Sequence, residues 1–285
     1  GHPGQNGGGV MMLDIRDLSV VFTDRGAPFT AVDRFSLRMD RGEIVGVVGE
    51  SGSGKSMTAH ALMGLIQRSQ VTVSGSALFE GTDLLALSRE ELRQYQGRDL
   101  SIIFQEPMTS LNPTMRVGAQ VEESLRIHGK LSRAERKARA LEAMALAGLP
   151  EPEAVYRQWP HQLSGGMRQR AMIASALVLR PRLLIADEPT TALDVTIQAQ
   201  ILETLREINR REGAAILFIS HDLGVVKALC SRVVVMKRGR IVESGPVDEV
   251  FYHPKEEYTR LLISSRPARK KLRGGGGDGS AHGAH

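Results

Sequence analysis

The 285-residue sequence is poor in cysteine and in aromatic residues, and each shortage excludes a class of protein. Its single cysteine, Cys230, cannot form an internal disulfide or a cysteine-ligated metal site, which excludes a secreted disulfide scaffold. Aromatic residues make up 4% of the chain, which argues against a surface built to stack nucleic-acid bases. No apolar run approaches the roughly 18 residues of a membrane span, so we do not expect an integral membrane protein.

An excess of charge of one sign is also slight. Lys and Arg number 37 against 32 Asp and Glu, and much of the net charge of +5 falls at Arg266, Arg269, Lys270, Lys271 and Arg273. Such a small basic tail is weak evidence for an anionic partner, and we expect no nucleic-acid partner. We interpret residues 1–11 as a flexible, tag-like end and 266–285 as a basic, Gly-rich tail. One domain is expected over 12–265.

Short runs rich in Val and Ile alternate with helical patterns along that domain. Continuous apolar residues predict buried strands at 44–49, 100–104, 183–187, 215–220 and 233–236. Segments 13–22 and 35–39 alternate and predict an antiparallel layer. Residues 105–165 predict a helical insertion, in which an S-x-x-E capping box at Ser132 opens a helix to about Ala147. The fold class is α/β, with an antiparallel β subdomain and a helical subdomain.

A glycine-rich loop after the first buried strand indicates a phosphate-binding site. Its sequence, Gly49-Glu50-Ser51-Gly52-Ser53-Gly54-Lys55-Ser56, matches G-x-x-x-x-G-K-[ST] between a strand and a helical pattern. The glycines let backbone N–H groups turn toward phosphates, and the helix N-terminus adds the positive end of its dipole. We expect Lys55 to reach the β- and γ-phosphates of a nucleotide and Ser56 to bind Mg²⁺.

Two further segments add a hydrolytic pair of carboxylates and a second anion site to the phosphate loop. The strand at 183–187 ends in Asp187, expected to hold the Mg²⁺ shell through water, and Glu188 follows as general base for water attacking the γ-phosphate. Ser164-Gly165-Gly166 opens a long helical pattern and forms a second anion site. Each segment alone is common and often structural, but their presence with the phosphate loop favours the functional interpretation.

The order of these motifs resembles the nucleotide-binding subunit of ATP-binding cassette (ABC) transporters, a branch of the P-loop NTPases, over residues 12–265. The phosphate loop corresponds to that family's Walker A motif, Leu163–Met167 to its signature and Leu183–Asp187 to its Walker B motif. A kinase is disfavoured because no H-R-D catalytic loop is present. DNA-repair and chromosome-organising ATPases carry coiled coils or zinc modules that do not fit in this chain.

The resemblance assigns roles to four more residues. Gln105 would be the Q-loop glutamine, which senses Mg²⁺ and the attacking water, and His221 the switch histidine, which bonds the γ-phosphate. Asp194 would belong to the D-loop at the nucleotide. Phe22 holds the place of the adenine-stacking aromatic, although packing in an edge strand explains it equally well.

The resemblance also implies a second cassette. In this family two cassettes face each other head to tail, so that Ser164, Gly165 and Gly166 of one act on the ATP held by the Walker A motif of the other. A monomer is therefore expected to be nearly inactive.

Three segments resemble the oligopeptide/dipeptide/nickel branch of bacterial importers: QEPMTSLNPTMRVGAQ at 105–120, LSGGMRQRAMIA and ADEPTTALDVTIQAQIL. The likeness implies ATP and Mg²⁺ as cofactors and a peripheral position on the cytoplasmic face of the membrane. The implied partners are a different homologous ATPase subunit, two permeases and an extracytoplasmic substrate-binding protein. A di- or oligopeptide is the expected substrate. A nickel or metal-chelate importer, or a soluble ABC ATPase outside transport, stays open.

The ending FYHPKEEYTRLLISSRP at 251–267 resembles the C-terminal segment of the same branch. Its H-P and T-R pairs lie farther apart than is usual there, because Lys255, Glu256 and Glu257 are additional.

Overall fold

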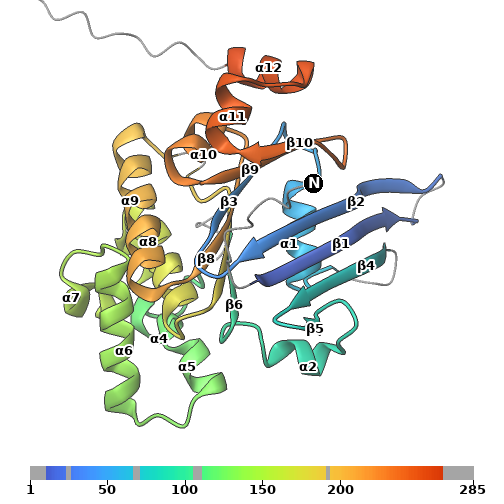
Figure 1. Cartoon of the computed structure of the whole chain (residues 1–285). Coiled ribbons are helices and arrows are strands. Elements are labelled where there is room, and N and C mark those ends of the chain that lie inside the picture. Colours follow the sequence, from blue (N-terminus) through green and yellow to red (C-terminus); the bar gives the residue numbers. More distant parts are fainter. Residues whose placement is uncertain (1–10, 24–26, 67–70, 105–110, 191–192, 266–285) are drawn as a thin grey trace, which may run out of the picture.

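Two β-sheets with helices around them form the structure (Figure 1). This computed structural model describes residues 11–23, 27–66, 71–104, 111–190 and 193–265. One sheet is antiparallel, in the order β2-β1-β4-β5, and the other has the order β10-β9-β3-β8-β7-β6. In the larger sheet only the β9–β10 pair, among the described strands, is antiparallel. The predicted α/β fold class is confirmed.

All the strands expected from the sequence form. The antiparallel sheet contains β1 (Met11–Phe22), β2 (Phe29–Asp40), β4 (Val71–Phe79) and β5 (Thr82–Asp83), and the larger sheet contains β3 (Ile44–Val48), β6 (Leu100–Ile103), β7 (Leu183–Asp187), β8 (Ala215–Ser220), β9 (Arg232–Lys237) and β10 (Arg240–Pro246). Two expectations need correction. Met11, placed in the N-terminal tail, begins β1 and pairs with Asp40. The strand that ends in Phe22 is paired on both sides and is not an edge strand.

Helices cover both faces of the larger sheet. The face toward the antiparallel sheet carries α1 (Lys55–Leu62) and α2 (Arg89–Arg93). The core on the other face includes α8 (Gly165–Leu177), α9 (Val195–Glu212) and α10 (Leu223–Leu229), and the chain continues into α11 (Val247–Tyr252) and α12 (Glu257–Ser264). No helix within the described ranges combines the length and apolar character needed to cross a bilayer.

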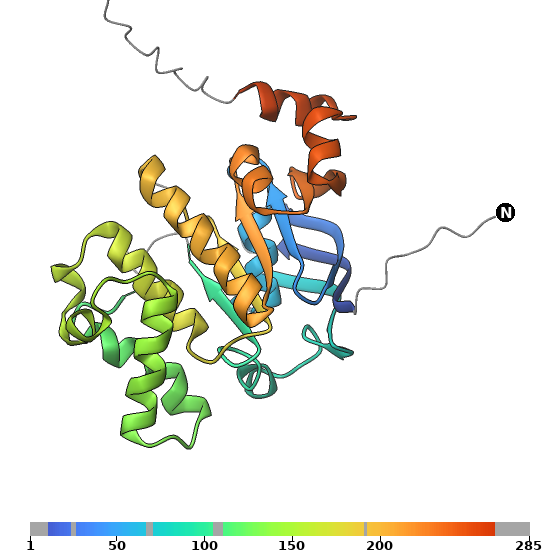
Figure 2. The same ribbon diagram turned by 60° about the vertical axis from the view of Figure 1, so that its left-hand side comes forward.

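The stretch from 111 to 165 contains helices and turns only, and Figure 2 shows that it projects to one side of the sheets. It contains α4 (Val117–Val121), α5 (Glu123–His128), α6 (Arg133–Leu146), α7 (Pro152–Arg157) and the 3₁₀ turn Pro160–Gln162. The capping box at Ser132 is confirmed, since its hydroxyl accepts from Glu135 and the Glu135 carboxylate accepts from Ser132 N–H. The first part of the predicted insertion, 105–110, lies outside the described residues.

The central strands bury side chains on both faces. In β8, Leu217 and Ile219 pack in a core shared with α1 and the antiparallel sheet, whereas Ile216 and Phe218 pack in a core shared with α8, α9 and α10. Because successive side chains of a strand point to opposite faces, a strand covered on both sides shows an unbroken apolar run. This is the pattern from which the strands were predicted.

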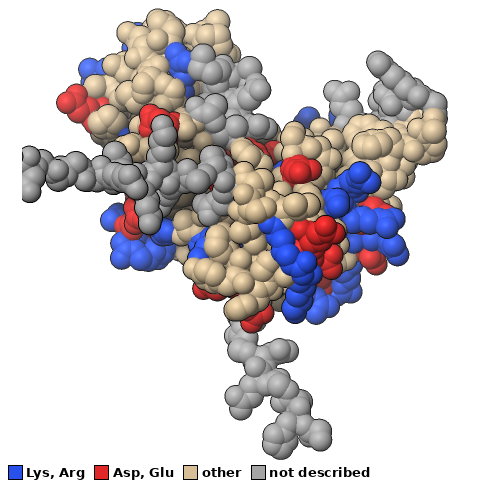
Figure 3. Space-filling model, turned by 90° about the horizontal axis from the view of Figure 1, so that it is seen from above, with Lys and Arg blue, Asp and Glu red and all other residues tan. Residues whose placement is uncertain are grey.

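Charged side chains of both signs are interspersed on the surface. On the face seen in Figure 3, Lys and Arg side chains lie next to Asp and Glu side chains. Elsewhere among the described residues, Arg182 pairs with Asp99 at 2.8 Å, and Arg240 pairs with Asp33 at 2.6 Å. The net charge of +5 therefore gives this face no extended patch of one sign.

Gly46, in the middle of β3, lies against α10. A Cβ atom there would approach Val226 Cγ1 to 2.2 Å, and Val226 is a stiff β-branched residue. Gly46→Ala is expected to lower the free energy of unfolding by about 1–3 kcal/mol through overpacking, as measured by urea unfolding.

Two matched variants sharpen this test. Gly245→Ala, where a Cβ would lie an ordinary 3.6 Å from Val250 Cγ2, is expected to cost less. Val226→Ala should reduce the cost of Gly46→Ala when the two are combined, because it removes the clashing methyl group. Equal costs for Gly46→Ala and Gly245→Ala would contradict the close approach.

Candidate nucleotide-binding site

The turn from β3 into α1 forms an open cradle of backbone groups. Gly54 is the N-cap of α1 and has φ of +99°, in the left-handed region that favours glycine. A Cβ at Gly54 would also lie 2.5 Å from the carbonyl oxygen of Ala31, so only glycine fits. The N–H groups of the first turn of α1 lack intrahelical partners, and the helix dipole places positive potential there. This end of α1 is suited to bind phosphate groups.

Lys55 is buried beneath the loop, with 5% of its surface exposed. Its ammonium donates to the carbonyl oxygens of Gly49 at 2.7 Å and Glu50 at 2.9 Å. Burial lowers the pKa of Lys55, and the charges of Glu188, Asp187 and Glu50 oppose that shift. The lysine thus sits at the loop among carbonyl groups and carboxylates, where a nucleotide's phosphates would bring the negative charge that it can neutralise.

Ser56 and Asp187 come together from different elements. The Ser56 hydroxyl, in the first turn of α1, donates to Asp187 Oδ1 at 2.8 Å at the end of β7. Burial raises the pKa of Asp187, although the Ser56 hydrogen bond and the nearby His60 lower it. A hydroxyl and a buried carboxylate beside a phosphate loop are ligands that suit Mg²⁺, so the donor set fits this ion.

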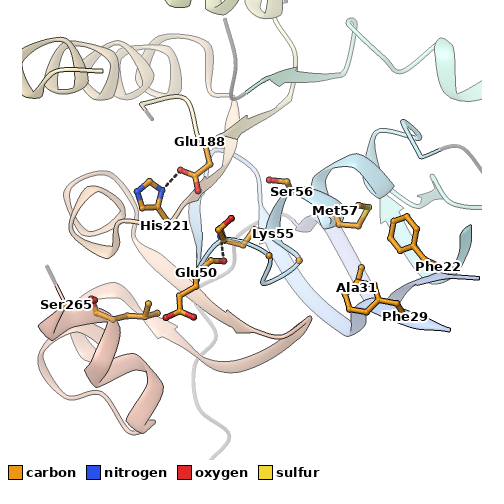
Figure 4. A pocket seen from close by; sticks show the side chains of 14 residues that line it. Phe22, Phe29, Ala31, Glu50, Lys55, Ser56, Met57, Glu188, His221 and Ser265 are labelled. Carbon is orange, nitrogen blue, oxygen red and sulfur yellow. Dashed lines mark hydrogen bonds and ion pairs between the residues drawn. The ribbon is translucent and has the colours of Figure 1, made fainter. Parts of the chain in front are cut away.

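Glu188 and His221 face the same space from neighbouring strands, as Figure 4 shows. The Glu188 carboxylate lies 2.9 Å from His221 Nδ1. Glu188 is 7% exposed and has φ of +51°, which is uncommon for a residue with a side chain. Its N–H donates to the carbonyl oxygen of Ile219 at 2.9 Å, which holds this conformation. Residues kept in such sparsely populated conformations cluster at functional sites.

A single open cavity of about 990 Å³ joins these groups. At one end lie Phe22, Phe29, Ala31 and Met57, and at the other end lie Glu188 and His221 (Figure 4). The Phe22 and Phe29 ring centroids are 6.4 Å apart. The apolar end with its aromatic rings suits the base of a nucleotide, and the phosphate loop in the middle suits its phosphates. The carboxylate–histidine pair at the other end lies where the last phosphate would react.

Comparison with known proteins identifies the family. A family model described as ABC transporter matches residues 32–191. The chain belongs to the ABC transporter family. It is 50% identical over 256 residues to the dipeptide transport ATP-binding protein DppD of Haemophilus influenzae, covering 90% of this chain and 78% of that protein. It is also 50% identical to the oligopeptide transport ATP-binding protein OppD of Bacillus subtilis, covering 90% and 72%.

A solved structure supports the same assignment. An ATP-binding cassette in a dimeric, post-hydrolysis state with ADP and Pi superposes with a TM-score of 0.74 at 28% identity, covering 83% of this chain and 99% of that chain. The present chain is thus an ATP-binding ABC cassette with ATPase activity.

The ABC signature residues lie apart from the cavity. Ser164 is the N-cap of α8, and its hydroxyl accepts from the N–H of Met167 at 3.3 Å. Gly165 begins that helix, and Gly166 lies against α9, where a Cβ would be 3.1 Å from Ile197 Cγ2. The described lining of the cavity comes from other elements. The second anion site predicted from the sequence therefore does form a helix start, but it does not meet the phosphate loop of its own chain.

Of two further predicted residues, Asp194 and Gln105, the structure describes only Asp194. Asp194 is the N-cap of α9 and accepts from the N–H of Ile197 at 2.8 Å, which gives it a structural contact besides the predicted one. Gln105 lies outside the described residues. The roles of all these side chains at a nucleotide stay predictions.

The sequence missed several cavity residues. Phe29, Ala31 and Met57 join Phe22 at the apolar end, and Leu262 and Ser265 reach the opposite end from the C-terminal segment. Met57 follows the phosphate loop directly and could have been included. The others depend on how distant segments pack, for which the sequence carries no local signal.

The caps of α6 and α8 give a prediction for stability. Ser164→Ala removes the acceptor at the start of α8 and is expected to lower the free energy of unfolding by about 1 kcal/mol, measured by urea unfolding. Ser164→Asp keeps a capping oxygen and should keep the stability. Ser132→Ala, which removes an equivalent 3.3 Å bond to Glu135 N–H, serves as the reference for the size of the loss. An unchanged midpoint for Ser164→Ala would contradict the cap.

Proposed function

We propose that this chain is the ATP-hydrolysing subunit that energises a bacterial importer of di- or oligopeptides. The observation that carries the ATPase half is that Lys55, Ser56, Glu188 and His221 line one cavity, with Asp187 hydrogen-bonded to Ser56 behind the lining. The peptide half rests on relatives named for dipeptide and oligopeptide transport at 50% identity.

In this proposal the cavity binds ATP along its length. Phe22 and Phe29 contact the base, the loop Gly49–Ser56 surrounds the phosphates, and Lys55 neutralises their charge. Ser56 and Asp187 hold Mg²⁺, with Gln105 contributing from outside the described residues. When bound, Mg²⁺ offsets the negative charge of the β- and γ-phosphates.

Glu188 is the proposed general base. Its carboxylate lies at the γ-phosphate end of the cavity and can accept the proton of an attacking water. His221, 2.9 Å away, orients that carboxylate and lines the same end of the cavity, where it would donate a hydrogen bond to the γ-phosphate. The strained backbone of Glu188 fixes the carboxylate before the substrate arrives.

Glu188→Gln keeps the size of the side chain but removes its basicity. The full chain is expected to bind ATP as the wild type does, while hydrolysis in the assembled transporter falls by about 100- to 10,000-fold, the usual contribution of a general base. Binding is followed by calorimetry and turnover by phosphate release. Glu203→Gln on the exposed side of α9 is the matched control. Hydrolysis at the wild-type rate by Glu188→Gln would show that another group is the base.

The signature residues are proposed to complete the site of a second cassette. Ser164, Gly165 and Gly166 form a helix N-terminus, which suits an anion, yet lie away from the cavity of their own chain. A head-to-tail pair of cassettes would bring this helix start to the partner's ATP. The solved relative described as dimeric with ADP and Pi is compatible with such a pair.

The Ser164 variants separate the cap from this contact. Ser164→Asp keeps the cap but adds a negative charge where the partner's phosphates are proposed to bind. Hydrolysis by the assembled transporter is therefore expected to fall by about 100-fold or more, since opposed like charges cost several kcal/mol. Ser132→Ala should hydrolyse ATP normally. A fully active Ser164→Asp variant would disprove the contact.

The proposed membrane partners dock at a groove on the helical side. This groove, of about 460 Å³, lies between the edge strand β6 and the helices α5 and α8. Phe104 and Glu123 are exposed in its lining, whereas Leu111 is only 6% exposed. Two permeases, a second ATPase subunit and an extracytoplasmic binding protein complete the proposed transporter, which places this chain on the cytoplasmic face of the membrane.

The docking can be tested with a single added cysteine. Cys230 is buried and its pKa is raised by burial, so the wild-type chain should not react with thiol crosslinkers. Glu123→Cys is expected to crosslink to a permease in membranes of cells that co-express the transporter. Asp248→Cys, exposed on α11 at the opposite end of the molecule in Figure 1, should not. Crosslinks to ribosomal proteins instead would favour a soluble ABC ATPase.

A further inference from the structure

The C-terminal segment reaches the phosphate loop from 208 positions away in the sequence. It consists of α11 and α12 and lies at the top of Figure 1, beyond β10. Near the start of α12, the phenol oxygen of Tyr258 accepts a hydrogen bond from the backbone N–H of Glu50 at 3.0 Å. Leu262 and Ser265, farther along the same segment, line the nucleotide cavity. The segment is therefore part of the wall of the site.

The Tyr258 contact acts on the same peptide unit that holds Lys55. The N–H of Glu50 and the C=O of Gly49 belong to one peptide bond, and that C=O accepts from Lys55 Nζ at 2.7 Å. Because the peptide group is planar, fixing its N–H fixes the direction of its C=O. Tyr258 thus controls the orientation of a group that positions the lysine expected to bind the phosphates.

Tyr258 is itself held firmly. It is 7% exposed and packs in the core that includes α10, and the Lys237 ammonium lies 4.8 Å from the centre of its ring. Burial raises the pKa of Tyr258, so the phenol stays neutral at physiological pH and does not repel a nucleotide's phosphates. A buried, neutral acceptor is suited to hold the N–H of Glu50 in place.

A carboxylate on β10 fixes the start of α12. The carboxylate of Glu243, on β10, accepts from the N–H of Lys255 at 2.8 Å and of Glu256 at 3.2 Å. The turn between β9 and β10 contacts the loop as well, since Gly239 N–H donates to the Ser53 carbonyl oxygen at 2.9 Å. The strands and the segment after them therefore support the loop at two points on its outer side.

We propose that Tyr258 is a positioning residue for ATP binding, which holds the Gly49–Glu50 peptide and, through it, Lys55. The inference rests on the proposed use of this loop to bind ATP. It assigns the C-terminal segment a function in the nucleotide site, separate from the signature and the base.

Tyr258→Phe tests this with the smallest change, because it keeps the ring and removes the acceptor. For the full chain, the dissociation constant for ATP is expected to rise by about 3- to 10-fold, the value of one hydrogen bond. In the assembled transporter KM for ATP should rise by a similar factor while kcat stays within about twofold. The melting temperature without ATP should change little, and the stabilisation by ATP should decrease.

Two comparison variants make the result decisive. Tyr252→Phe, whose hydroxyl bonds Lys227 away from the loop, should bind ATP as the wild type does. Tyr258→Leu also removes the ring, and it should weaken ATP binding no less than Tyr258→Phe. If only the Leu variant loses affinity, or if Tyr258→Phe lowers kcat without raising KM, the positioning role is overturned. A wild-type chain that fails to bind ATP would instead overturn the proposed function.

Discussion

The structure depends on keeping charged groups buried next to a loop whose N–H groups stay open. Lys55, Asp187 and Glu188 are all almost fully buried, and an unpaired ion in a protein interior costs several kcal/mol. Each has a partner: loop carbonyls hold Lys55, Ser56 donates to Asp187, and His221 contacts Glu188. The charged groups and their partners come from the end of β7 and from the segments that follow β3, β7 and β8, so the order of the sheet determines whether the charges can be buried at all.

That order follows from the pairing of parallel strands. β3 pairs with β8 and β8 pairs with β7, which brings Val48, Ser220 and Asp187 together at the edge of the sheet formed by the carboxyl ends of these strands. The crevice at the carboxyl ends of parallel strands is where ligands bind in open α/β sheets. Because helices cover one face and α1 with the antiparallel sheet covers the other, this edge remains the open route for a nucleotide.

Local patterns predicted much of this arrangement. The loop Gly49–Ser56 lies between a strand and a helix in the sequence itself, and the unbroken apolar runs revealed the doubly covered strands. Contacts between segments far apart in the sequence could not be predicted, because no local sequence pattern encodes them. Tyr258 reaches Glu50 only through the packing of α12 on α10, and Phe29 meets Phe22 only because β1 and β2 pair at that end. The pairing of β1 on both sides likewise depends on β4, which the sequence did not predict.

Ser164 caps α8 and Asp194 caps α9, and both are also predicted to act at a nucleotide. The two side chains differ in whether the cap leaves them able to bind a phosphate. A serine hydroxyl has one donor and two acceptor sites, so Ser164 can accept from Met167 N–H and still donate to a phosphate. An ionised aspartate only accepts, so Asp194, which accepts from Ile197 N–H, has no proton to offer a phosphate and would repel it at close range. Of these two capping residues, both among those predicted to contact the nucleotide, Ser164 is therefore suited to direct contact. Asp194 is suited to act through the start of α9 or through an intervening donor.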